Sequence, residues 1–203
     1  MLLAMTVLDD ALSPCMARRR RADEALKQSI NTPGHVLRLL QLAQLQLARH
    51  APAQPLAPTA LLAAQLLHRS VRRAPLPELD AAADGICHLL GVGKRWSACL
   101  TQLGLAAAVT VIRCDHPPLE LLDRLQRNFD CNDAADRNVV LCLLRLLGEE
   151  LYSPAGRLSV APGRVELVSA QLRGRTPSVL AQLHNWLVEA ASSSYTAAAP
   201  GAA

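Results

Sequence analysis

The sequence predicts an all-α protein, and three features support this fold class. Apolar residues make up 51% of the chain but aromatic residues only 2%, so leucine and alanine must fill the interior. Both are strong helix formers, whereas the β-branched and aromatic residues typical of strands are sparse. The apolar residues recur at helical spacing, and prolines interrupt them at regular distances. We therefore expect nearly the whole chain to be helical.

Prolines divide the chain into intervals of similar length. Pro33, Pro75 and Pro117 are each 42 residues apart, and Pro154 follows after 37. Each interval has room for two amphipathic helices, and a further pair precedes and another follows these intervals. The expected pairs are 2–12 and 17–31, 34–50 and 59–73, 77–90 and 95–113, 118–129 and 134–151, and 163–173 and 177–190.

A period of about 40–47 residues built from two helices is typical of HEAT and armadillo repeats. One helical hairpin cannot bury its apolar face alone, so neighbouring hairpins stack into a superhelix. We therefore predict an α-solenoid of HEAT-like hairpins, a right-handed superhelix, over residues 1–190. A compact helical bundle is the alternative that the spacing leaves open. Residues 191–203 form a low-complexity tail that we expect to be disordered.

The segment "TALLAAQLLHRSVRR" at 59–73 shows the amphipathic pattern most clearly. Its leucines and alanines occupy a broad apolar face, which predicts a helix packed in a core. The segment is too short and too charged to cross a bilayer, which takes about 20 apolar residues. The opposite face carries polar residues at i, i+3, i+4 and i+7, namely Gln65, His68, Arg69 and Arg72.

Charge and cysteine usage exclude several classes of function. The net charge of +4 is too mild to predict a nucleic-acid partner, and the basic run Arg18–Arg21 is read as a solvated helix turn rather than an RNA-binding or nuclear-localisation patch. None of the six cysteines belongs to a CxxC pair, which indicates free thiols and no metal site. The start "MLLAMTVLDD" is a poor signal peptide, so we expect a soluble intracellular protein with no membrane insertion.

No arrangement of residues predicts catalysis. The stretch "GVGKRWS" at 91–97 lacks the full spacing of a phosphate-binding loop and follows a helix, so we interpret it as the break between two helices. No Ser-His-Asp or Cys-His pattern is present. We therefore predict that the chain is not an enzyme and that it holds no cofactor.

Glu149 and Glu150 stand at the end of the expected helix 134–151. Acidic residues there oppose the helix dipole, at a cost of roughly a few tenths of a kcal/mol each. Three explanations remain open: the helix continues past them, an arginine pairs with them, or some other interaction holds them in place.

Five segments, in order, share patterns with one group of known proteins. They are "RRRADEALKQSINTPGHVLRLLQL" (19–42), "LLAAQLLHRSVRR" (61–73), "CLTQLGLAAAVTVI" (99–112), "LLRLLGEELYS" (143–153) and "RVELVSAQLRGRTPSVLAQLHNWL" (164–187). Together they resemble the N-terminal portion of the importin-β (karyopherin-β) nuclear transport receptors, in the importin-13 and transportin-3 branch. The chain departs from that pattern at Gly148, where a proline is usual, near His35, where a tryptophan is usual, and near Val109, where an aspartate is usual.

This resemblance implies a function in protein import into the nucleus. Its N-terminal HEAT repeats would bind the small GTPase Ran in its GTP form, its outer surface would meet FG-nucleoporins, and its inner face would carry protein cargo. Such a protein shuttles between cytoplasm and nucleus through the nuclear pore. The receptors of this family are several times longer than 203 residues. The alternative is a generic HEAT scaffold or adaptor without Ran binding. The partner-binding candidates are Gln65, His68, Arg69, Arg72, Glu149 and Glu150.

Overall fold

A computed structural model describes residues 5–49, 55–114, 133–152 and 163–197, together with residues 123 and 160. All secondary structure in these ranges is helical, which confirms the all-α prediction for the described part of the chain. The helices are α1 (Met5–Ala11), α2 (Met16–Ile30), α3 (His35–Ala48), α4 (Pro58–Val71), α5 (Leu76–Gly93), α6 (Ser97–Arg113), α8 (Ala134–Tyr152) and α9 (Arg164–Ala197).

The predicted helix boundaries agree well with the structure. The helices expected at 34–50, 59–73 and 95–113 begin and end within two residues of α3, α4 and α6. Proline explains the starts of two helices, because Pro58 is the first residue of α4 and Pro75 directly precedes α5. Proline suits the first turn, where its missing N–H has no helical partner to lose. The helix expected at 118–129 lies outside the described residues.

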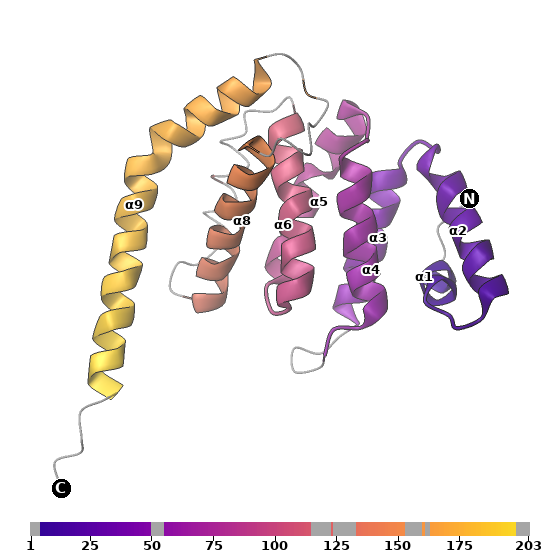
Figure 1. Ribbon diagram of the computed structural model, residues 1–203, viewed down its shortest axis with the longest axis horizontal. Coiled ribbons are helices and arrows are strands. Elements are labelled where there is room, and N and C mark those ends of the chain that lie inside the picture. The colour runs from indigo at the N-terminus through magenta and orange to yellow at the C-terminus, as the bar shows by residue number, and fades with distance from the viewer. Residues whose placement is uncertain are drawn as a thin grey trace, which may run out of the picture. The chain divides into compact units, whose positions relative to one another are not determined.

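The chain divides into two compact units, Met1–Arg164 and Val165–Ala203. In the first unit the helices pack in two layers. One layer contains α4, α6 and α8, with α6 packed against both of the others, and the second contains α3 packed against α5. Within the expected pairs, α3 packs against α4 and α5 packs against α6 (Figure 1). At the N-terminus α1 packs against α2 and also contacts α4.

The core centres on α6. Residues 106–112 of this helix are all buried, and Leu103 is fully inaccessible. A helix that is apolar all round needs neighbours on several sides, and α6 has them in α4, α5 and α8. The helix α6 is therefore the central helix of the first unit.

Two arginines donate hydrogen bonds to backbone carbonyls at the C-terminal ends of helices. The guanidinium of Arg113 donates to the carbonyl oxygens of Val71 (2.5 Å) and Ala74 (2.8 Å), just where α4 ends. Arg164 does the same for α6, donating to the carbonyl oxygens of Ile112 (3.2 Å) and Cys114. The last carbonyls of a helix lack helical partners, so each arginine satisfies groups that would otherwise need water. The contact of Arg113 thus joins the helix pair α5–α6 to the pair α3–α4.

The second unit consists of α9, and here the structure corrects two expectations. We expected a break near Pro177, but α9 runs unbroken for 34 residues through it (Figure 1). The hydroxyl groups on either side of the proline donate to backbone carbonyls of the same helix, Thr176 to Leu172 at 3.2 Å and Ser178 to Arg175 at 2.9 Å. The tail expected to be disordered from residue 191 is helical as far as Ala197. In the part of the chain that the structure describes, no helix is both long enough and apolar enough to span a membrane.

Candidate protein-binding surface

The polar face of α4 turns toward the neighbouring helices of its own layer. His68 lies at its centre, where its Nδ1 is 3.3 Å from Oε1 of Gln102 on α6. Burial lowers the pKa of His68, and the hydrogen bond with Gln102 offsets part of that effect. His68 is therefore a neutral, half-buried side chain that links α4 to α6, rather than a freely exposed contact residue. Gln65, one turn earlier, is also half-buried.

Arg72 crosses the layer to reach α8. Its Nη1 lies 2.8 Å from Oε1 and 2.9 Å from Oε2 of Glu150, although 78 residues separate the two in sequence. Only 28% of the arginine side chain and 12% of the glutamate side chain are exposed. Charge-assisted bonds of this kind are stronger than neutral ones, and partial burial shields the pair from solvent screening. Two of the residues that the sequence offered as separate candidates thus form one ion pair.

The length of α8 and two ion pairs account for the acidic residues near its end. The helix continues to Tyr152, two residues beyond Glu150, so the acids do not stand at its very end. Glu150 pairs with Arg72, and Glu149 pairs with Arg145 one turn earlier at 3.3 Å. The second pair is exposed on both sides and adds little stability. Two of the three open explanations therefore hold, and Glu149 alone faces solvent.

Arg69 is placed differently from His68 and Arg72. It is exposed, and together with Arg72 and Arg73 it lines a pocket that reaches to α2 and α3. The six candidates therefore do not form one continuous patch. His68, Arg72 and Glu150 tie α4, α6 and α8 together, Arg69 borders the pocket, and Glu149 is exposed on α8.

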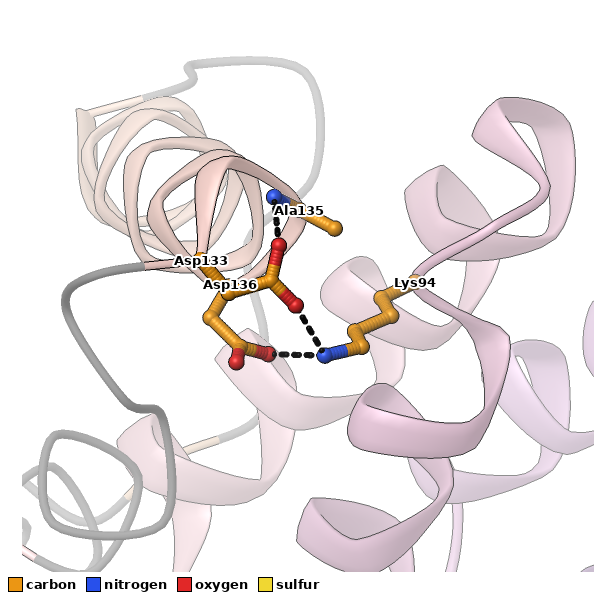
Figure 2. Close-up of polar contacts among 4 residues, drawn as sticks. All are labelled: Lys94, Asp133, Ala135 and Asp136. Atoms are coloured by element: carbon orange, nitrogen blue, oxygen red, sulfur yellow. Dashed lines mark hydrogen bonds and ion pairs between the residues drawn. The ribbon is translucent and has the colours of Figure 1, made fainter.

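The glycine-rich stretch at 91–97 contains a second cluster of charges. Nζ of Lys94 lies 2.9 Å from Oδ2 of Asp133 and 2.6 Å from Oδ1 of Asp136 (Figure 2). The hydrogen bonds that Lys94 donates to Asp136 and Asp133 raise the pKa of Lys94, and the bond that Asp133 accepts from Lys94 lowers the pKa of Asp133. Because two carboxylates already hold this ammonium group, it is poorly placed to receive a phosphate. The stretch instead joins the end of α5 to the start of α8.

Sequence reasoning missed several residues that form hydrogen bonds between helices. Gln102 forms a hydrogen bond with His68 of α4. Arg113 donates a hydrogen bond to the backbone carbonyl of Val71, at the end of α4. Both stand in an otherwise apolar helix, and a polar side chain in such a setting is a usable signal, because it must find a partner when buried. Glu78, which accepts a hydrogen bond from the backbone N–H of Val36 at 2.5 Å, had no comparable signal.

The cysteines are free thiols wherever the structure describes them, as expected. Burial raises the pKa of Cys99 to about 11 and also raises the pKa of Cys114, so neither thiol is reactive at neutral pH. Cys131 lies outside the described residues.

Comparison with known proteins adds no assignment. No protein-family model matches the chain, and its sequence matches no curated protein.

Proposed function

We propose that this chain is a HEAT-like helical-repeat protein that corresponds to the N-terminal portion of an importin-β-type nuclear transport receptor and binds Ran in its GTP form. One observation supports the architecture most directly. The helix pairs α3–α4 and α5–α6 pack side by side, with like helices in like layers, and α8 extends the layer of α4 and α6. That is the stacking expected when each pair relies on its neighbour to bury its apolar face.

Such an array suits the binding of another protein. Stacked pairs expose side chains from several helices on one extended surface, and residues far apart in sequence become neighbours there. In the layer of α4, α6 and α8, Arg72 and Glu150 are neighbours although 78 residues separate them in the sequence. Following the resemblance, FG-nucleoporins and protein cargo would use other faces of the receptor, which would shuttle between cytoplasm and nucleus.

A second candidate is a helical-repeat scaffold that lacks Ran binding. The mutual pairing of Arg72 with Glu150, and of His68 with Gln102, favours it. Arg72 and Glu150 already neutralise each other, so a partner would find fewer unpaired charges on this layer than the sequence suggested. Both candidates predict a folded helical array. They differ in whether the chain binds Ran in a way that depends on the bound nucleotide.

Biolayer interferometry on the purified chain separates the two candidates. Immobilised Ran is loaded either with a non-hydrolysable GTP analogue or with GDP, and the chain is the analyte. A nuclear transport receptor binds the GTP form at least about tenfold more tightly, a difference of about 1.4 kcal/mol. A protein that is folded by circular dichroism but binds neither form, or both forms equally, contradicts the receptor proposal and leaves the scaffold.

The same assay tests which candidate residues take part. Arg69→Glu and Glu149→Lys change exposed charges that hold no other helix in place, so neither change should unfold the chain. If either residue contacts Ran, its variant binds the GTP form more weakly by several-fold, since charges at an interface mainly alter the association rate. Unchanged binding by both variants would place the Ran contact elsewhere.

A further inference from the structure

A pocket of about 580 Å³ lies between the N-terminal helices of the first unit. Its volume falls within the range of sites that accept ligands or side chains of a partner. Leu26 and Ile30 of α2 line it, as do Val36 and Leu39 of α3 and Leu66 of α4. Leu26 and Ile30 belong to α2. Because α1 packs against both α2 and α4, it connects α2 to the other helices of the first unit. The walls are thus mainly apolar and come chiefly from α2, α3 and α4, with Glu78 of α5 as a further lining residue.

Positive charge gathers at the end of this pocket. Arg69, Arg72 and Arg73 line it where α4 ends, and Glu78 is the acidic residue among its lining groups. The carboxylate of Glu78 already accepts the backbone N–H of Val36, at the N-terminus of α3. Arg72 is held by Glu150, whereas Arg69 and Arg73 are exposed. An apolar pocket bordered by exposed guanidinium groups is complementary to a ligand that joins apolar groups to carboxylates.

A buried histidine supports the same conclusion. His35 also lines the pocket and is only 5% exposed. Its Nε2 lies 3.0 Å from Oγ of Ser70, while its Nδ1 has no hydrogen-bond partner among the described residues. A buried polar atom without a partner is unfavourable, and a bound acceptor or donor would satisfy it.

We propose that this pocket binds an acidic amphipathic peptide of a partner protein, with its apolar side chains against Leu26, Ile30 and Leu66 and its carboxylates at Arg69 and Arg73. The proposal deepens the proposed function, because it names a class of partner segment, and it rests on the chain being a protein-binding array. The carboxylates would form bidentate bonds with the guanidinium groups, which gives orientation as well as affinity. The apolar side chains would supply most of the buried area.

Fluorescence anisotropy with a defined probe tests this proposal on the full chain. The probe is a fluorescein-labelled helical peptide of about 16 residues, with leucines at i, i+4 and i+7 and glutamates on both sides of them. We expect saturable binding that weakens at least about tenfold when the glutamates are replaced by glutamines, because the arginines then lose their charged acceptors. A third peptide, with serines in place of the leucines, should not bind.

Matched protein variants locate the site. Arg69→Glu combined with Arg73→Glu should abolish binding, and Ile30→Asp, at a side chain that is 50% exposed, should weaken it without unfolding the chain. Arg49→Glu reverses the charge of a single arginine at the far end of α3, about 20 Å along the helix from His35, and should leave binding unchanged. Equal effects of the Arg49 and Arg69/Arg73 changes would overturn the proposal, as would a failure of the glutamate peptide to bind the folded chain.

This test can fail independently of the proposed function. The Arg69→Glu/Arg73→Glu variant can also be measured against Ran in both nucleotide states. If Ran binding is GTP-dependent but no peptide binds, the pocket proposal fails and the receptor proposal stands. If the peptide binds as expected but Ran binds in neither state, the pocket belongs to a scaffold with a different partner.

Discussion

At the scale of single residues, polar side chains link helices that are distant in sequence. Lys94, His68 and Arg72 each bind a side chain on another helix or at its start. The sequence shows that these residues are polar and on which helix each lies. It cannot show their partners, because a partner is chosen by tertiary packing and not by local spacing.

Replacing Lys94 with methionine should destabilise the fold by about 1–3 kcal/mol, because it leaves the carboxylate of Asp136 without its cation. The side chain of Asp136 is only 10% exposed. Urea unfolding followed by circular dichroism measures the change. Arg95→Met is the matched control at the neighbouring exposed residue, and its effect should stay within about 0.5 kcal/mol. Equal effects of the two changes would show that the Lys94 pair contributes nothing.

Acid should destabilise the fold through His35 and His68. Burial lowers the pKa of both, and for His35 the charge of Arg38 acts in the same direction while Glu78 opposes it. A base whose folded pKa lies below its unfolded value of 6.5 is protonated first in the unfolded state. The stability contributed by the neutral histidines is therefore complete above pH 6.5 and is lost as the pH falls below it.

Urea unfolding at about pH 7.5 and about pH 5.5 tests this pH dependence, with a loss of at most about 1 kcal/mol per histidine. The carboxylates still carry most of their charge in this range, so the histidines dominate the change. The double variant His35→Asn and His68→Gln should lose less stability on acidification than the original chain. An identical loss in both proteins would rule out the histidines as the cause.

At the scale of secondary structure, glycine positions show where helices approach closely. A Cβ added to Gly104 of α6 would lie 2.7 Å from Cδ1 of Leu146 and 3.6 Å from Sγ of Cys142, both on α8. Leu146 is 2% exposed and has little room to move. A Cβ added to Gly148 of α8 would meet nothing within 4 Å. Two glycines in neighbouring helices therefore have different roles.

Substituting alanine at these two glycines should have opposite effects. Gly148→Ala should stabilise the fold by about 0.5–1 kcal/mol, since alanine is the better helix former and space is available. Gly104→Ala gains the same propensity but overpacks the contact between α6 and α8, which costs about 1–3 kcal/mol and makes the net change destabilising. Thermal unfolding of the two variants side by side gives the signs, and stabilisation by both would mean that α6 and α8 do not approach closely at Gly104.

Helix positions were largely predictable, and the exception has a physical reason. Composition, apolar periodicity and proline spacing located α3, α4 and α6 to within two residues. The same reasoning placed a break at Pro177, because proline lacks an N–H and disfavours helix in the residue before it. The helix nevertheless continues through Pro177, so the local preference of one proline does not decide where this helix ends.

At the scale of the whole molecule, the prediction of an all-α chain is confirmed for the described residues. The partner-binding role of the six candidate residues stays a prediction. Three of them, His68, Arg72 and Glu150, bind other helices of the same layer, and Arg69 lines a pocket. Periodicity identifies the polar face of a helix, but it cannot tell whether solvent or a neighbouring helix lies against that face.

The stacking of helix pairs into one array is the central claim, and the proposed function depends on it. A double-mutant cycle at Arg72 and Glu150 tests it directly, because these residues lie 78 positions apart, on α4 and α8, and meet only if the pairs stack as described. Arg72→Met, Glu150→Gln and the double variant are compared by urea unfolding, with Glu149→Gln as the exposed control. We predict a coupling free energy of about 1–3 kcal/mol between Arg72 and Glu150. A coupling indistinguishable from zero, with both single variants folded, would contradict the array.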